Sequence, residues 1–395
     1  MAHGGMEQKR LLLILDGAAD RPCLELGNRT PLEAAQTPNT DRLARNGVVG
    51  RARTVPEEFT AASDVANLSL LGHNPIGVYT GRGPLEAAAM GVDLEPDDIA
   101  FRVNTVTLAE EKLKDYSAGH ITTEESRRII EDLQPVVKEL GGALYPGVQY
   151  RHLMVRRDGA EWRSFPPHDN IGRSVEEMLP PSGPLREIFE RSRDLLREHP
   201  VNEKRRAEGK NTVDALWPWG QGKAVRLRSI REEYGVRGAL VSAVDLVRGI
   251  GVLAGYEILR VEGITGYYNT NYAGKGEAMI EAFASGVTVG VVHVEPPDEA
   301  GHEGKADEKV RALERIDEFI LGPILEAFPD IKVLIAPDHP TYLETRCHGS
   351  EPVPFLFYDS RVPCQGPEKY AESTASGEVV EGWSLLPRLM EGVSK

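Results

Sequence analysis

The sequence predicts an α/β protein with a mostly parallel sheet, into which a smaller α+β domain is inserted. Continuous apolar runs such as RLLLILDG, at residues 10–17, are typical of central strands buried on both faces. Amphipathic helical stretches alternate with these runs, which favours the α/β class. The chain of 395 residues is long enough for one large domain with an insertion, or for two domains.

The first third of the chain alternates predicted strands and helices. Asp16 follows the first apolar run directly, so it lies at the carboxyl end of a predicted strand. Residues 30–47 predict a short turn and then a helix, and residues 48–55 predict a second strand. Residues 99–108 form another apolar run, which predicts a further strand.

Ser63 precedes an apolar helical stretch, and this position has two interpretations. As an N-cap residue, its side chain would accept hydrogen bonds from the unpaired amides of the first turn. As a nucleophile, it would use the same amides and the positive end of the helix dipole, which favour an alkoxide and hold a phosphate. The two interpretations share one geometry, so the groups opposite Ser63 decide between them.

The character of the chain changes after Leu108. Residues 111–181 contain a polar loop, a strongly amphipathic helix with a capping-box start, one or two strands and a final Pro- and Gly-rich linker. We therefore predict an inserted α+β domain at 111–181 and a discontinuous core domain at 1–110 and 182–395.

The stretch from Val292 to Phe357 contains most of the candidate metal ligands. Two runs of β-forming residues each end in acidic and histidine residues, and a third histidine follows: Asp298, His302, Asp338, His339 and His348. Ligands of open α/β sheets bind beyond the carboxyl ends of the strands, so these side chains and Asp16 can converge. Carboxylate and imidazole ligands suit Mn²⁺, Mg²⁺ or Zn²⁺, and two such ions about 3.5–4 Å apart serve phosphoryl transfer.

The overall composition excludes several classes of partner. A formal net charge of −15 disfavours binding to nucleic acid or to an anionic membrane, and no apolar run is long enough to cross a bilayer. Three cysteines without C-x-x-C spacing indicate a reducing compartment, so we expect a cytoplasmic protein. The chain has no P-loop motif, no G-x-G-x-x-G after its first strand and no G-x-S-x-G around Ser63.

The order and wording of the motifs identify a family. LDGAADRP, TPNTDRLARNG, SDVANLSLLGHNP, TGRGPLEAA, DEAGHEG, APDHP and CHGSEPVPF resemble the archaeal-type cofactor-independent phosphoglycerate mutases of the alkaline phosphatase superfamily. The resemblance covers nearly the whole chain. It implies an alkaline-phosphatase-like three-layer core with two divalent metal ions (Mn²⁺, Zn²⁺ or Mg²⁺), a capping lid domain and no 2,3-bisphosphoglycerate cofactor.

The resemblance also implies roles for individual residues. One metal ion would be bound by Asp298, His302 and His348, and the other by Asp16, Ser63, Asp338 and His339. Ser63 would carry phosphate between the 3- and 2-hydroxyls of glycerate, so the expected substrate is a small phosphorylated metabolite, 3-phosphoglycerate. The residues expected to bind its carboxylate and phosphate are Arg82, Arg102, His168, Asp169, Arg173 and Lys275.

Alternatives to the mutase remain open at this point. The NTVDALWPWGQG segment resembles a bacterial subgroup of the family proposed to be homoserine kinases, and a metal-dependent phosphatase would use the same metal site. A binding module without catalysis is a third hypothesis, which loss of a metal ligand would favour. The sequence is compatible with more than one oligomeric state, and a homo-oligomer is one of them.

Overall fold

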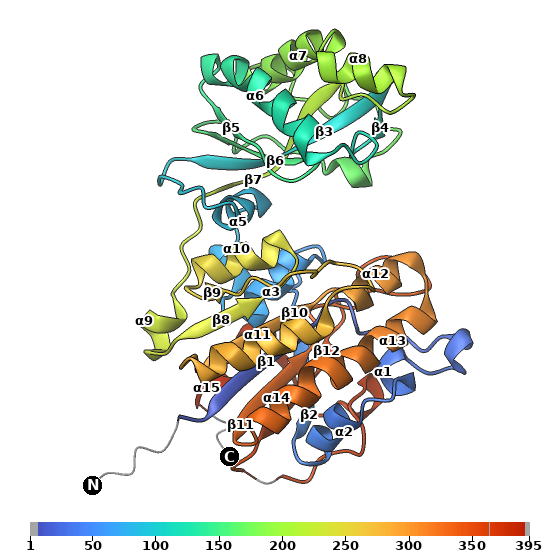
Figure 1. Cartoon of the computed structure of the whole chain (residues 1–395), viewed down its shortest axis with the longest axis vertical. Helices are drawn as coiled ribbons and strands as arrows, with labels where there is room; N and C mark the ends of the chain where they lie inside the picture. Colours follow the sequence, from blue (N-terminus) through green and yellow to red (C-terminus); the bar gives the residue numbers. More distant parts are fainter. Residues whose placement is uncertain (1–6, 363, 392–395) are drawn as a thin grey trace. The chain divides into compact units, whose positions relative to one another are not determined.

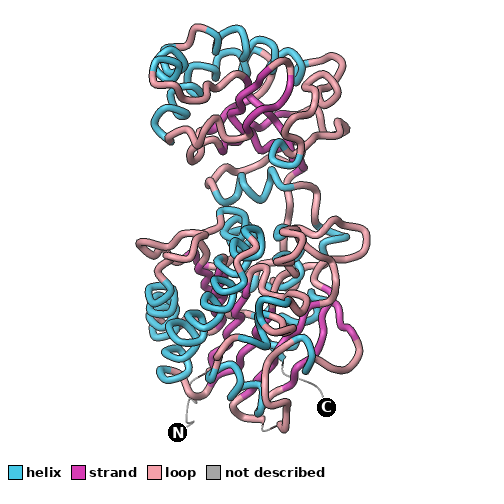
Figure 2. Tube along the Cα trace, turned by 90° about the vertical axis from the view of Figure 1, so that its right-hand side faces the viewer, coloured by secondary structure: helices cyan, strands magenta, loops and turns pink. Residues whose placement is uncertain are grey.

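The computed structural model describes residues 7–362 and 364–391, which fall into two compact units (Figure 1). The core unit comprises Met1–Tyr79 and Arg226–Lys395, and the inserted unit comprises Thr80–Val225. Each unit has its own sheet (Figure 2). In the described part of the chain, no helix is both long enough and apolar enough to cross a membrane.

The sheet of the core unit has eight strands. Their order is β13 (Val379–Glu381), β2 (Val48–Arg53), β12 (Val353–Asp359), β11 (Ile331–Ala336), β1 (Lys9–Leu15), β10 (Val289–Val294), β8 (Gly238–Val241) and β9 (Glu257–Ile258). Strand β12 is antiparallel to both of its neighbours, and the other pairs are parallel. The predicted mostly parallel sheet is confirmed.

Helices cover both faces of this sheet. Leu11, Leu13 and Leu15 of β1 point into one core with α2 (Pro38–Arg45), α11 (Tyr272–Ala284), α13 (Ala306–Ile316) and α14 (Gly322–Ala327). The alternate residues of β1, Leu12 and Ile14, are equally buried and therefore face the other side. That side is covered by α3 (Ser63–Leu70), α10 (Asp245–Leu253) and α15 (Leu385–Glu391). The result is a three-layer core.

The core unit also contains α-helices outside these two sets. They are α1 (Pro31–Ala34), α4 (Pro75–Val78), α9 (Ile230–Tyr234) and α12 (Pro296–Glu303), with a π-helical turn at Asp317–Leu321 between α13 and α14.

The sheet of the inserted unit is antiparallel. Its order is β4 (Lys112–Asp115), β3 (Ile99–Ala109), β6 (Arg151–Arg156) and β5 (Ala143–Tyr145), and β7 (Ala215–Lys223) also pairs with β3. The helices of this unit are α5 (Arg82–Ala89), α6 (Thr123–Glu139), α7 (Pro184–Arg197) and α8 (Pro200–Ala207). Strands and amphipathic helices enclose a separate apolar core, as the predicted α+β insertion requires.

The inserted unit is longer at both ends than the predicted 111–181. Strand β3 was assigned to the core by its apolar run, but it is hydrogen-bonded to β4, β6 and β7 in the second sheet. Helices α7 and α8 were likewise assigned to the core, yet α7 packs on β7 and both contact α6. The structure therefore moves the boundaries to Thr80 and Val225.

Candidate active site

Three neighbouring parallel strands of the core unit end at the same edge of the sheet. Asp16 follows β1, Asp338 and His339 follow β11, and Asp298 and His302 lie in α12, which begins two residues after β10. Strand β1 is paired with β10 on one side and β11 on the other, so the segments that follow them meet. Close packing there requires glycine after Asp16, because a side chain would overlap Asp298.

One group of possible metal ligands is formed by Asp16, Asp338 and His339, all of them buried. The His339 Nε2 atom lies 3.7 Å from Asp16 Oδ1 and 3.4 Å from Asp338 Oδ2. It is also 3.1 Å from Ser63 Oγ, at the first residue of α3. Asn67, one turn later, donates a 2.8 Å hydrogen bond to Asp338 Oδ2 and so orients that carboxylate.

A second group of possible ligands is centred on Asp298. His302 Nε2 is 3.3 Å from Asp298 Oδ2, and His348 Nε2 is 3.5 Å from Asp298 Oδ1. The two Nε2 atoms are 2.9 Å apart. The ligand atoms of Asp298, His348 and His339 also lie within 4.8 Å of one another, so His339 belongs to both groups. Thr341 donates a hydrogen bond to Asp298 from the loop after β11.

The histidine rings are oriented by backbone carbonyls. His339 Nδ1 is 3.3 Å from the carbonyl oxygen of Pro340, and His302 Nδ1 is 2.9 Å from that of Arg346. A carbonyl accepts only, so each Nδ1 carries a proton and each Nε2 points toward the carboxylates. This is the tautomer with which a histidine binds a metal through Nε2.

The charges of the site favour a bound cation. Burial raises the pKa of Asp16 well above its usual range, and the neighbouring Asp338 and Asp298 carboxylates raise it further. The hydrogen bond to Asp298 raises the pKa of His302 to about 9 despite partial burial. Asp16 Oδ1 is buried without a hydrogen-bond partner. Three carboxylates, three imidazoles and an unpaired buried oxygen fit divalent metal ions.

A buried network beside Asp16 was missed by the sequence analysis. His293 lies on β10 with its Nε2 3.3 Å from Asp16 Oδ2, and its Nδ1 is 3.3 Å from Glu295 Oε1. Burial lowers the pKa of His293, but Asp16 and Glu295 outweigh it and raise the value to about 10. The histidine and glutamate in VVHVE, an otherwise apolar strand, are the signal that could have revealed this network.

Lys275 belongs to the same network, which contradicts its predicted role as an anion contact. Its side chain is fully buried, and Nζ is 2.6 Å from Glu295 Oε2 and 2.8 Å from the carbonyl oxygen of His293. Lys275 does lie between glycines at a helix start, as the sequence indicated, but this first turn of α11 packs against β10, so the side chain is not available to an anion.

The predicted anion-binding residues of the inserted unit gather around an aromatic side chain. Arg102 and Arg82 lie over the Trp219 ring at 5.1 and 5.6 Å, and His168 meets its edge at 5.3 Å. Glu86 is 2.6 Å from Arg102 and 3.0 Å from Arg82. Burial lowers the pKa of His168, and both arginines lower it further although Asp169 opposes them. The cluster thus combines two guanidinium groups with one carboxylate.

Of the predicted residues, Asp169 and Arg173 lie at the side of this cluster. Arg151 and His152 were not predicted as site residues. Asp169 is 3.8 Å from His168, whereas Arg173 donates to Asn170 and lies over Phe165. Arg151 and His152, on the neighbouring β6, each have a buried nitrogen without a hydrogen-bond partner. The structure therefore adds Arg151 and His152 to the candidates and places Arg173 at the rim.

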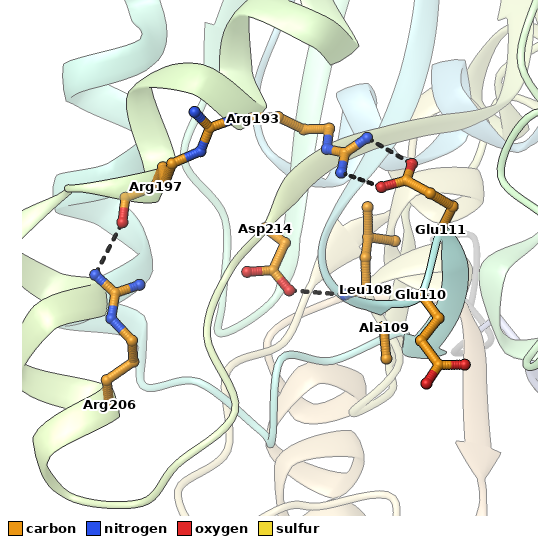
Figure 3. Close-up of a pocket in the computed structure, with 8 residues that line it drawn as sticks. All are labelled: Leu108, Ala109, Glu110, Glu111, Arg193, Arg197, Arg206 and Asp214. Atoms are coloured by element: carbon orange, nitrogen blue, oxygen red, sulfur yellow. Dashed lines mark hydrogen bonds and ion pairs between the residues drawn. The ribbon is translucent and has the colours of Figure 1, made fainter.

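A separate pocket of about 260 Å³ in the inserted unit contains no predicted site residue (Figure 3). Both terminal nitrogens of Arg193 lie 2.8 Å from the Glu111 carboxylate, and Arg206 donates to the carbonyl oxygen of Arg197. The positive charge of the arginines that line this pocket is thus partly neutralised by Glu111.

Fold and site together define a three-layer α/β protein with a mostly parallel sheet and groups suited to metal ions. A model of the 2,3-bisphosphoglycerate-independent phosphoglycerate mutase family matches residues 44–202. The chain belongs to this family, whose members are isomerases, and the family predicted from the motifs is confirmed.

Relatives with this name match along most of their length. The mutase of Methanosarcina barkeri is 47% identical over 89% of this chain and 90% of its own. The mutase of Methanothrix thermoacetophila is 44% identical over 97% of this chain and 100% of its own. The solved cofactor-independent phosphoglycerate mutase of Thermoplasma acidophilum is 27% identical, with a TM-score of 0.65 over 97% of this chain and 99% of that one.

Proposed function

We propose that this protein interconverts 3-phosphoglycerate and 2-phosphoglycerate in the cytoplasm through a phosphoserine at Ser63. The observation that carries the proposal is the position of Ser63 Oγ, 3.1 Å from His339 Nε2 and beside the converging carboxylates. The N-cap of α3 is Ala62 and Ser63 begins its first turn, which favours the nucleophile over the capping role.

The two metal ions would be bound by the groups that the sequence analysis assigned: Asp298, His302 and His348 for one, and Asp16, Ser63, Asp338 and His339 for the other. Bound there, two divalent cations would lower the pKa of the Ser63 hydroxyl and neutralise charge on the phosphoryl oxygens. We favour Mn²⁺, because carboxylate and imidazole ligands are mixed in both groups.

The chain's own residues then account for the transfer. The Ser63 hydroxyl loses its proton, and Oγ forms a bond to phosphorus while the bond between phosphorus and the 3-oxygen of glycerate breaks and that oxygen takes up a proton. The amides of the first turn of α3 favour the negative charge that accumulates there. Glycerate reorients, and its 2-oxygen takes the phosphoryl group back from Ser63. Arg82, Arg102, His168, Asp169 and Arg173 remain our candidates for binding carboxylate and phosphate.

Whether the enzyme acts as a mutase or as a phosphatase depends on the access of water to the phosphoserine. A phosphoserine that is open to solvent hydrolyses, so a mutase must exclude water until glycerate has reoriented. The ratio of isomerised to hydrolysed product therefore measures how well the inserted unit serves as a lid.

The test replaces Ser63 by Ala. We expect loss of isomerisation and of phosphoenzyme labelling, with Mn²⁺ still bound by the remaining ligands. Ser69→Ala is the matched control, because Ser69 lies on the same helix and its buried hydroxyl has no hydrogen-bond partner. Retained turnover in Ser63→Ala would exclude Ser63 as the nucleophile. Product from homoserine and ATP, with none from 3-phosphoglycerate, would instead support the kinase alternative.

A further inference from the structure

The Asp16 carboxylate uses its two oxygens differently. Oδ2 lies at ion-pair distance, 3.3 Å, from His293 Nε2, whereas Oδ1 is 3.7 Å from His339 Nε2. Oδ1 and His293 Nε2 are both buried without a hydrogen-bond partner. An ion pair at one oxygen restrains the rotation of the carboxylate about its last bond, because a cation is attracted to that side only. The contact with His293 therefore fixes the direction in which Oδ1 points, toward the proposed metal ions.

The backbone and two acceptors fix the ring of His293. His293 lies on β10 directly opposite Ile14 of β1, two residues before Asp16. Its Nδ1 is 3.2 Å from Ser242 Oγ and 3.3 Å from Glu295 Oε1. The Ser242 hydroxyl donates to Glu295, so Nδ1 faces two acceptors. A flipped ring would lose these contacts and direct a carbon at Asp16.

Glu295 and Lys275 contact His293 on the side away from Asp16 and at its backbone carbonyl. Glu295 accepts from Lys275 Nζ at 2.6 Å and from the Ala243 amide at 2.8 Å, and Lys275 also donates to the His293 carbonyl. All four charged or ionisable groups, Asp16 included, are at most 5% exposed. Well-packed apolar residues are often as stabilising as a buried ion pair, so stability alone does not explain this chain of contacts.

We propose that His293 is a positioning residue that fixes the Asp16 carboxylate for metal binding, and that Lys275 and Glu295 hold His293 in place. The inference rests on the proposed function, in which Asp16 is a metal ligand. Side chains that orient metal ligands in this way typically change metal affinity about 10- to 100-fold when they are removed.

The test measures Mn²⁺ binding to the full chain by calorimetry, without substrate. We expect His293→Leu to weaken binding at the Asp16-dependent site about 10- to 100-fold. His293→Gln, whose amide can still donate to Asp16, should recover most of the loss. His73→Leu is the control, because His73 is a buried histidine of the core unit that is not among the possible ligand groups. Binding of Mn²⁺ by a folded His293→Leu protein with wild-type affinity would overturn the proposal.

A double-mutant cycle separates positioning from general damage to the fold. In the background of Asp16→Asn, His293→Leu should cause no further loss of affinity; an equal loss with and without Asp16 would overturn the proposal. If His293→Leu does not fold, the Glu295→Gln variant takes its place. It must weaken Mn²⁺ binding at least about threefold, because the interaction of residue 295 with His293 would then lose its negative charge. Unchanged binding in Asp16→Asn would refute the metal site itself, whereas normal binding in His293→Leu alone refutes only the role of His293.

Discussion

Replacing Glu86 by Gln tests how the arginines of the inserted unit are held. This carboxylate is 8% exposed and accepts from Arg102 at 2.6 Å and Arg82 at 3.0 Å. Burial alone would raise its pKa, but the charges of Arg102 and Arg82 outweigh burial and lower it from 4.5 to about 2. Because the folded-state pKa is the lower one, the carboxylate stabilises the fold above pH 4.5, and this is lost as the pH falls from 4.5 to 2.

The contribution of Glu86 to stability can be measured in the inserted unit alone. A fall in pKa from 4.5 to about 2 corresponds to about 3 kcal/mol of stability at pH 7. Three of the four tryptophans, Trp162, Trp217 and Trp219, lie in the inserted unit, so fluorescence during guanidinium unfolding reports on it. We expect Glu86→Gln to lower the free energy of unfolding by about 3 kcal/mol at pH 7 and by progressively less toward pH 3.

An exposed ion pair provides the control for this prediction. Glu176 pairs with Arg186 on the surface of the same unit, and its replacement by Gln should change the unfolding midpoint negligibly. Identical midpoints for Glu86→Gln and the wild type at pH 7 would refute the argument that Glu86 stabilises the fold by pairing with Arg102 and Arg82.

Other perturbations give independent tests. Lys309→Met leaves Asp20 buried and unpaired, so it should lower the calorimetric stability of the core unit by about 3 kcal/mol, whereas Lys309→Met with Asp20→Leu should recover most of that loss. Burial, then Arg102 and Arg151, lower the pKa of His152 to about 3. Since the folded-state pKa is below 6.5, stability falls as the pH drops from 6.5 toward 3, and His152→Asn should flatten that part of the unfolding curve. Removing metal ions with a chelator should abolish isomerisation and added Mn²⁺ should restore it; undiminished activity without metal would contradict the proposed site.

Much of the candidate site could be predicted from the sequence, because the residues that follow parallel strands all lie at the same edge of the sheet. Asp16 directly follows one apolar run, Asp338 and His339 come within three residues of the end of another, and D-x-x-x-H places Asp298 and His302 on one face of α12. Local spacing and strand direction suffice for such residues, and no knowledge of strand order is needed.

Other features depend on pairings that local patterns do not contain. An apolar run predicts the strand at 99–108 but not its neighbours, which is why β3 was assigned to the wrong sheet. The role of His293 appears only once β10 is placed beside β1, and that of Lys275 only once α11 packs on β10. Residues that act through a partner distant in sequence are therefore the ones that sequence analysis misses.

The two charged clusters of the molecule have opposite compositions, and the substrate explains why. Around Asp16 the core unit gathers carboxylates, which attract cations and by themselves would repel a phosphate. Around Trp219 the inserted unit gathers guanidinium groups in excess over Glu86, which attract anions directly. In a chain with a net charge of −15, an anionic substrate needs local positive charge, and bound divalent cations would convert the acidic cluster into a phosphate-binding one. In the proposed function the phosphate would thus require the carboxylates indirectly, through the metal ions that they would bind.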